Sequence, residues 1–214
     1  MATAEKPEGP EKAEAASPGK MPRTARGRAT LRRLLDAAAK EFGDKGFHEA
    51  SISGITRRAG TALGTFYTYF DSKDAIFSAL VRDMSQSVAR AAAAGITPGA
   101  TGVQREREAL AAFLAFAREH KELYRIIDEA EFADPESYRA HYEGTATRIA
   151  ARLDESVAKG TLAPGNNEIR AWAVMGMNVF LGLRYGMWDE DRPIEDITSV
   201  AMSILNSGIA GAGE

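Results

Sequence analysis

The stretch AGTALGTFYTYFDSKDAIF, residues 59–77, decides the fold prediction for this chain. It places four aromatic residues within five positions, after two glycines and before the sequence Asp-Ser-Lys. Phe66 and Phe70 are spaced i, i+4, so they share one face of a helix and can anchor it to a core. The threonine and tyrosine hydroxyls between them point elsewhere and suit phosphate oxygens and base edges of DNA. The stretch therefore predicts a short helix with a buried side and a DNA-facing side.

Two helices are predicted before this stretch and one after it. The first has an apolar face formed by Leu31, Leu34, Leu35, Ala38 and Phe42, and is expected to end at Gly43 and Gly46. Ser51 can cap the second, which Gly60 closes after about two turns. Asp71 or Ser72 can cap the fourth. Short helices joined by a glycine-bearing turn are typical of a helix-turn-helix, whose second helix enters the major groove.

Lys73 stands in the first turn of the predicted fourth helix, where the helix dipole disfavours a cation by a few tenths of a kcal/mol. A phosphate bound there would reverse that sign and use the free N–H groups of the helix start. We therefore expect Lys73 to hold a DNA phosphate. Ser51 could do the same at the second helix, whereas the sequence does not say whether Arg57 or Arg58 faces DNA.

Charge is unevenly distributed along the chain. Residues 23–73 contain ten basic and five acidic residues, a net charge of +5, whereas residues 74–214 contain fourteen basic and twenty-one acidic residues, a net charge of −7. A basic unit joined to an acidic body indicates a polyanionic partner for the first unit alone.

Residues 28–77 resemble the DNA-binding domain of tetracycline-repressor (TetR) family regulators. The resemblance lies in FGDKGFHEASISGITRRAGTALGTFYTYFDSKDAIF, residues 42–77. It implies a homodimer, repression of nearby genes and an effector pocket in the C-terminal helices. It also implies that Ser51, Tyr67 and Lys73 contact phosphates, and that Ala62, Leu63, Thr65, Thr68 and Tyr69 lie nearest the bases. Gly64 would leave room for the DNA where the helix approaches it most closely.

The chain departs from the family pattern in the second helix. Ser53-Gly54 replaces charged helix formers, and a glycine inside a helix costs about 1 kcal/mol. Leu63 is apolar where many members are polar, so contacts to thymine methyls and DNA shape are expected to contribute to recognition.

The rest of the chain predicts further helices, giving an all-α fold of about nine helices. Residues 171–183 are apolar nearly all the way round apart from Asn178, so this helix is expected to be buried on every side, by its own core and by a partner subunit. With a last helix at residues 193–210, it would form a four-helix bundle across a homodimer, with Val179 and Ile204 in the interface. Two recognition helices would then lie about 34–36 Å apart.

We expect three segments: a disordered tail at residues 1–22, the helix-turn-helix domain at 23–72, and the effector-binding and dimerisation domain at 73–214. Candidates to line the effector cavity are Phe113, Tyr124, Ile127, Phe132, Tyr138, Tyr142, Trp172, Met175 and Phe180. Ordinary core packing is the competing interpretation for these residues. Tyrosine hydroxyls and methionine suit an adaptable pocket for an apolar or amphipathic molecule, such as an acyl compound. We expect the acidic residues Asp128, Glu129 and Glu131 to be exposed to solvent. The alternative is that one of these carboxylates is buried and selects a cationic ligand.

Several classes of protein are disfavoured. The chain has no cysteine and only three scattered histidines, so we expect no metal site and no cofactor. No nucleophile–base pair, carboxylate dyad or phosphate loop emerges, which argues against an enzyme. The sequence contains no apolar run of about 18 residues, so we expect no membrane span. It also shows no secretory signal, so we expect a cytoplasmic location.

These patterns predict a ligand-responsive DNA-binding transcriptional regulator. It would repress from a pseudo-palindromic operator in double-stranded DNA and leave when a small apolar or amphipathic effector binds. Two alternatives stay open: an architectural DNA-binding protein without an effector, and a regulator whose recognition region contacts another protein.

Overall fold

The computed structural model describes residues 22–207, so the predicted tail lies outside this range except for Pro22. Residues 22–207 form nine α-helices and one π-helical turn, with no strand, which confirms the all-α prediction. The elements are α1 (Ala25–Glu49), α2 (Ile52–Ala59), α3 (Leu63–Tyr69), α4 (Lys73–Ala94), α5 (Gly102–Glu119), α6 (Glu122–Ala133), α7 (Pro135–Ala158), α8 (Asn167–Gly182), η1 (Leu183–Trp188) and α9 (Ile194–Ser207).

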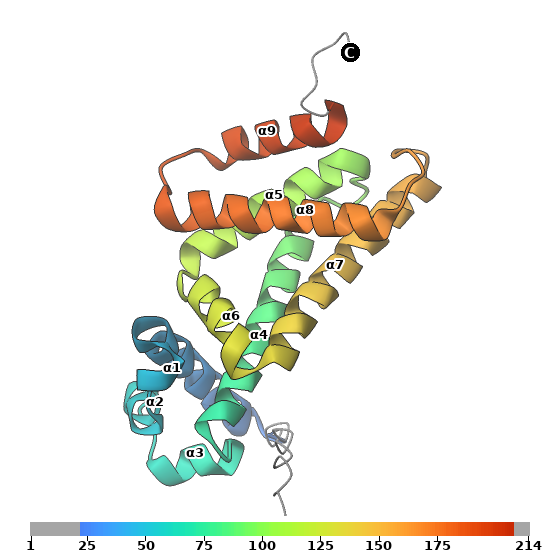
Figure 1. Ribbon diagram of the computed structural model, residues 1–214. Helices are drawn as coiled ribbons and strands as arrows, with labels where there is room; N and C mark the ends of the chain where they lie inside the picture. The colour runs from blue at the N-terminus through green and yellow to red at the C-terminus, as the bar shows by residue number, and fades with distance from the viewer. Residues whose placement is uncertain (1–21, 208–214) are drawn as a thin grey trace, which may run out of the picture.

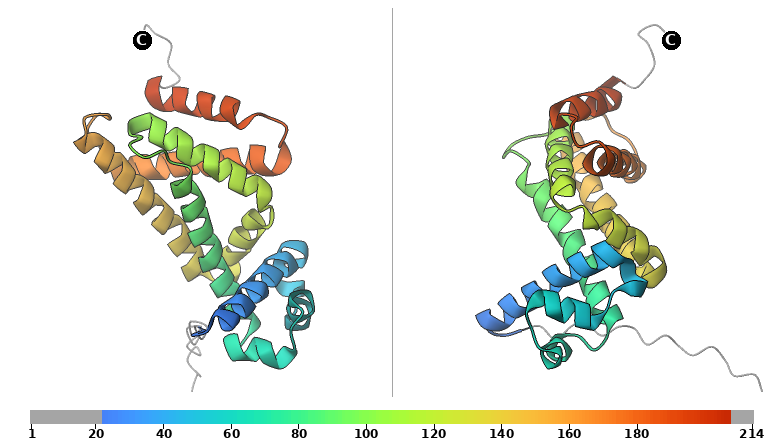
Figure 2. Two further views of the ribbon diagram at one scale, coloured as in Figure 1. Left: turned by 180° about the vertical axis from the view of Figure 1, so that it is seen from behind. Right: turned by 90° about the vertical axis from the view of Figure 1, so that its left-hand side faces the viewer.

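The helices form a small unit and a larger body (Figure 1). Helices α1, α2 and α3 lie at one end of the molecule, whereas α5, α8 and α9 lie at the other (Figures 1 and 2). Helix α4 begins in the small unit and runs into the body, where it packs against α6 and α7. Helix α4 thus runs through both parts, and α6 also packs against α1.

One apolar core extends from the small unit into the body. Phe42, Phe66 and Phe70 are buried in it, and the Phe42 ring meets Phe77 of α4 edge-on at 5.1 Å between centroids. Helix α6 contributes Ile126 to the same cluster. The predicted boundary between residues 72 and 73 therefore separates two parts that share a core, and it stays a prediction.

Helix α1 is longer than its pattern predicted. It continues to Glu49, with a break at Gly46, whose φ of 79° favours glycine. Gly43 lies inside the helix instead of ending it. A Cβ atom there would lie 2.6 Å from Cβ of Glu122, so the missing side chain lets α6 pack closely on α1.

Helix α8 is buried on one side only in the single chain. Ala171, Val174 and Met175 belong to a core cluster shared with α7, whereas Trp172 and Phe180 are 44% and 72% exposed. The core of the chain therefore buries one side of α8, and burial of the other side by a partner subunit stays a prediction. Residues 208–210 of the predicted last helix lie outside the described range.

Candidate functional site

The pair α2 and α3 has helix-turn-helix geometry. Ser51 caps α2, its Oγ accepting a 3.0 Å hydrogen bond from the Gly54 amide. Gly60 ends α2 in the left-handed conformation, with φ of 62°. Phe66 is fully buried and fixes α3 to the core. The turn and the anchor together determine which side of α3 faces outward.

Helix α3 presents most of its predicted DNA-contacting residues to solvent. Leu63 and Tyr67 are 51% and 48% exposed. Ala62, Gly64 and Thr68 are exposed as well, and Thr65 is half-buried. This exposed surface, together with the half-buried Ser51 hydroxyl, is the candidate DNA-binding face.

Tyr69 lies apart from that surface, contrary to expectation. Its ring packs against the core, and its hydroxyl donates a 3.3 Å hydrogen bond to the carbonyl oxygen of Gly27 in the first turn of α1. The side chain therefore ties α3 to α1 instead of extending toward bases.

Lys73 has a structural role that the argument from the helix dipole missed. Its Nζ donates hydrogen bonds to the carbonyl oxygens of Phe47, His48 and Ala50, at 2.7, 3.1 and 3.2 Å. It also lies 4.6 Å from the centroid of the Phe47 ring. All three ammonium protons are thereby used at the end of α1, and a contact between Lys73 and a DNA phosphate stays a prediction.

The two arginines of α2 differ in their partners. Arg58 pairs with Glu41 at 2.6 Å and with Asp44 at 2.8 Å, whereas Arg57 is exposed and has no salt bridge among the described residues. Arg57 is therefore the α2 arginine available to DNA.

Glu41 is a fully buried carboxylate in the DNA-binding unit. Burial pushes its pKa upward, but hydrogen bonds from Lys45 and Arg58 outweigh burial, and the net pKa is lowered. Gly54 lies directly against it, so that a Cβ on Gly54 would overlap the carboxylate. The glycine that departs from the family pattern makes room for a buried ion pair.

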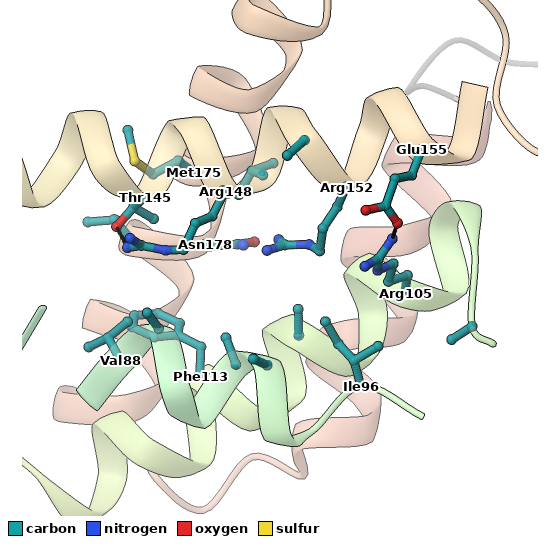
Figure 3. A pocket seen from close by; sticks show the side chains of 18 of the residues that line it. Val88, Ile96, Arg105, Phe113, Thr145, Arg148, Arg152, Glu155, Met175 and Asn178 are labelled. Carbon is teal, nitrogen blue, oxygen red and sulfur yellow. Dashed lines mark hydrogen bonds and ion pairs between the residues drawn. The ribbon is translucent and has the colours of Figure 1, made fainter. Parts of the chain in front are cut away.

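A cavity of about 500 Å³ lies in the body, among α4, α5, α6, α7 and α8 (Figure 3). It brings together five of the predicted lining residues: Phe113, Tyr124, Ile127, Tyr142 and Met175. Val88, Ile96 and Phe113 lie on one wall, opposite the side chains of α7 (Figure 3). The apolar wall suits a ligand with a hydrocarbon portion.

The other predicted lining residues lie elsewhere. Tyr138, Trp172 and Phe180 line a second, more open hollow that shares Tyr124, Tyr142 and Met175 with the first. Phe132 is 84% exposed and lines neither. Phe132 lies in the last turn of α6, where its side chain is exposed to solvent instead of facing either cavity.

The cavity also has a polar side that the sequence did not reveal. Arg105, Thr145, Arg148, Arg152, Glu155 and Asn178 line it. The three residues Arg148, Arg152 and Glu155 recur at i, i+4 and i+7 along α7, which places them on one helical face. That spacing was visible in the sequence, but a charged helical face usually faces solvent, so it carried no signal for a cavity.

Uncharged polar groups complete the cavity wall. The Tyr124 hydroxyl donates a 2.8 Å hydrogen bond to the carbonyl oxygen of Val179, and burial raises the pKa of Tyr124 and Tyr142, so both phenols stay neutral. Burial, with a smaller effect of Arg148, lowers the pKa of His141 to about 4. His141 is therefore neutral near pH 7, where its Nδ1 lies 2.7 Å from Oγ of Ser85.

Helix α6 connects the cavity with the DNA-binding unit. Tyr124 and Ile127 line the cavity, and Arg125 between them donates hydrogen bonds to the carbonyl oxygens of Gly43 and Asp44 in α1, at 2.9 and 3.0 Å. One turn further, the Glu129 carboxylate accepts a hydrogen bond from the backbone N–H of Phe47. The same short helix thus contacts both sites.

Residues 22–207 contain no cluster of three or more histidine, aspartate or glutamate side chains suited to a metal ion. None of the helices described here is both long and apolar enough to span a membrane.

Residues 34–80, which include α2, α3 and the start of α4, match the family of bacterial regulatory proteins called tetR. The DNA-binding unit of this chain is a TetR-family domain. The match lies on the unit whose helix-turn-helix geometry is described above, and it confirms the resemblance found in the sequence.

Similar proteins divide into local and full-length matches. The HTH-type transcriptional regulator YdgC of Bacillus subtilis is 46% identical over 63 residues, which cover 29% of this chain and 32% of YdgC. This match thus spans about a third of the length of that relative. YhgD, a regulator from the same organism, is 23% identical over 176 residues, covering 78% of this chain and 88% of YhgD.

Two solved structures share the fold over most of this chain. A TetR-like regulator from Rhodococcus sp. RHA1 is 23% identical, with a TM-score of 0.69 over 90% of this chain and 100% of its own. FadR from Bacillus subtilis, solved in complex with stearoyl-CoA, is 20% identical, with a TM-score of 0.72 over 84% and 99% of the two chains. At these identities the likeness establishes the fold alone.

Proposed function

We propose that the protein is a homodimeric repressor that leaves its operator when an apolar or amphipathic molecule enters the cavity. The contacts of α6 carry this proposal. A ligand against Tyr124 or Ile127 would displace α6, and Arg125 would pass that displacement to α1 through its two carbonyl hydrogen bonds. Because α1 packs against α2, the recognition helix would move with it.

The proposed operator contact is the exposed face of α3. Tyr67 and Thr68 offer hydroxyls, and Leu63 offers an apolar contact for a thymine methyl. Arg57 and the exposed Arg23 and Arg26 supply positive charge around the same unit. We expect the operator to be a pseudo-palindromic duplex, because two such faces in a symmetric dimer would read two half-sites.

The proposed dimer interface is the exposed apolar side of α8 and α9. Trp172, Gly176 and Phe180 recur at i, i+4 and i+8 on one side of α8, and a Cβ on Gly176 would meet open space. Val200 and Ile204 form a matching exposed pair on α9, at 64% and 43% exposure. Large exposed apolar residues concentrated on two neighbouring helices support an interface with a second copy.

The proposed effector has a hydrocarbon chain. The apolar wall of the cavity supports this assignment, as does the complex of FadR with stearoyl-CoA in a chain of the same fold. The alternative function is an architectural DNA-binding protein without an effector. An enzyme is not proposed, because the proteins similar to this chain are described as transcriptional regulators.

A DNA-binding experiment tests the proposal. Fluorescence anisotropy would measure binding of the protein to duplex fragments from around its own gene, with and without dodecanoate or stearoyl-CoA. We expect binding that weakens with salt and is released by at least one of the two compounds. Binding that neither compound changes would favour the architectural alternative.

Two matched variants test whether the cavity is the site of release. Ala92→Trp fills the cavity from α4, whereas Ala115→Trp adds the same group at an exposed position of α5 outside the cavity. We expect Ala92→Trp to lose the response to the releasing compound and Ala115→Trp to keep it. An unchanged response in Ala92→Trp would place the effector elsewhere.

A further inference from the structure

The cavity holds three arginines, and two of them are neutralised by carboxylates. Arg152 makes a bidentate pair with Glu106, with Nε and Nη2 at 2.8 and 2.7 Å from its two oxygens. Arg105 pairs with Glu155 at 2.5 Å (Figure 3). Each pair removes one positive charge from the cavity.

Arg148 is the guanidinium left over. Its Nη2 donates a 3.0 Å hydrogen bond to Oγ1 of Thr145, and no carboxylate of residues 22–207 forms a salt bridge with it. It lines the cavity and is exposed in the single chain. Burial of part of the side chain and the nearby charge of Arg152 lower its pKa, so its surroundings lack a compensating negative charge.

Lys159 also lines the cavity, at the far end of α7 beyond Glu155, and it helps to lower the pKa of Glu155. The neutral His141 adds no charge. Arg148 and Lys159 are therefore the cavity cations without a salt bridge among residues 22–207, and Lys159 lies at the end of α7 away from Asn178.

Asn178 provides an independent indication of a polar ligand group. It lies between Arg148 and Arg152 across the cavity (Figure 3). Its Oδ1 is buried and has no hydrogen-bond partner among the described residues. A buried polar atom without a partner is destabilising, and the amide can turn to offer either its oxygen or its N–H groups. A polar head group beside Arg148 would satisfy it.

We propose that Arg148 and Asn178 bind the anionic head group of the effector, so that the cavity selects an amphipathic anion over a neutral molecule of the same chain length. The hydrocarbon chain would lie against Val88, Ile96 and Phe113 on the opposite wall. This inference rests on the proposed function, since it names the chemical class of that effector. The anionic group is either the carboxylate of a fatty acid or a phosphate of the coenzyme A portion of an acyl-CoA.

The test compares three probes by isothermal titration calorimetry without DNA. Dodecanoate carries a carboxylate, dodecanol is its neutral counterpart, and dodecanoyl-CoA carries phosphates. We expect at least one anionic probe to bind about 10- to 100-fold more tightly than dodecanol, as for a charge-assisted hydrogen bond. The tighter of the two anions identifies which group Arg148 holds.

Arg148→Gln and Arg139→Gln form a matched pair on α7. Arg139 is exposed and lies outside this cavity. We expect Arg148→Gln to weaken the anionic probe about 10- to 100-fold while leaving dodecanol unchanged, and Arg139→Gln to change neither.

Equal affinity for dodecanol and both anions would overturn the inference, as would failure of all three probes to bind. Unchanged anion affinity in Arg148→Gln would also overturn it. Because these titrations contain no DNA, a protein that binds the anion but never leaves DNA would contradict the proposed function and leave this inference standing.

Discussion

Replacing Gly54 by alanine separates local helix propensity from tertiary packing, because the two predict opposite signs. Gly54 lies inside α2, where alanine is favoured by about 1 kcal/mol. Propensity alone therefore predicts that Gly54→Ala stabilises the protein. The structure predicts the reverse, because the new methyl group would overlap the buried carboxylate of Glu41.

The magnitude follows from how firmly that carboxylate is held. Glu41 is fully buried and accepts hydrogen bonds from Lys45 and Arg58, both at 2.6 Å, so moving its carboxylate would disturb both ion pairs. Forcing an extra carbon into a packed interior costs about 1–3 kcal/mol, and a contact this close belongs at the upper end. After subtracting the gain in propensity, we expect Gly54→Ala to lower the free energy of unfolding by about 2 kcal/mol.

Equilibrium urea unfolding at fixed protein concentration, followed by circular dichroism, measures this change. Gly64→Ala is the matched control in the neighbouring helix, since a Cβ on Gly64 would meet nothing within 4 Å. It should raise the free energy of unfolding by about 0.5–1 kcal/mol. In a Glu41→Ala background the overlap disappears, so Gly54→Ala should there become stabilising.

The reasoning is refuted if Gly54→Ala is as stable as the unmodified protein or more stable. It is also refuted if the Glu41→Ala background leaves the effect of Gly54→Ala unchanged, because the two residues would then not interact.

Three further outcomes are expected. Lys73→Met removes the hydrogen bonds at the end of α1 and should lower the free energy of unfolding by about 1–2 kcal/mol. The salt dependence of its DNA binding should not change. If the salt slope instead falls by about one unit while stability is unchanged, Lys73 contacts a phosphate. Phe180→Asp should convert the dimer to monomers in sedimentation experiments, and a variant that sediments as the unmodified dimer would move the interface away from α8. The pKa of His141 is about 4 in the folded state, below the ordinary value of 6.5, so the unfolded chain binds the proton at a higher pH than the folded chain. The free energy of unfolding should therefore fall as pH decreases from about 6.5 to about 4, by at most about 3 kcal/mol. His141→Asn should therefore show a smaller loss over that range, and identical pH profiles would contradict the assignment.

The two residues that the sequence placed in a dimer interface differ in their exposure. Ile204 is exposed, as an interface residue should be in the single chain. Val179 instead packs toward the core cluster of α7 and α8 and lines the cavity. Its neighbour Phe180 occupies the outward position, because successive residues of a helix differ by about 100° in direction.

The sequence by itself determined the helical elements and the helix-turn-helix. Those features depend on residues close together in the chain: the i, i+4 spacing of Phe66 and Phe70, the cap at Ser51, and the Asp134 cap that accepts a 3.1 Å hydrogen bond from the amide of Ser137. Helix faces and caps are settled within about two turns, so a linear pattern contains them.

Only the tertiary structure decided which charges meet. Lys73 reaches carbonyls more than twenty positions earlier, Arg58 reaches Glu41 across two helices, and Arg148 is left unpaired because Glu106 and Glu155 are taken by other arginines. Such pairings depend on the angles and depths at which whole helices pack. No local period encodes those angles, and the function of a charged side chain depends on the partner that they bring within reach.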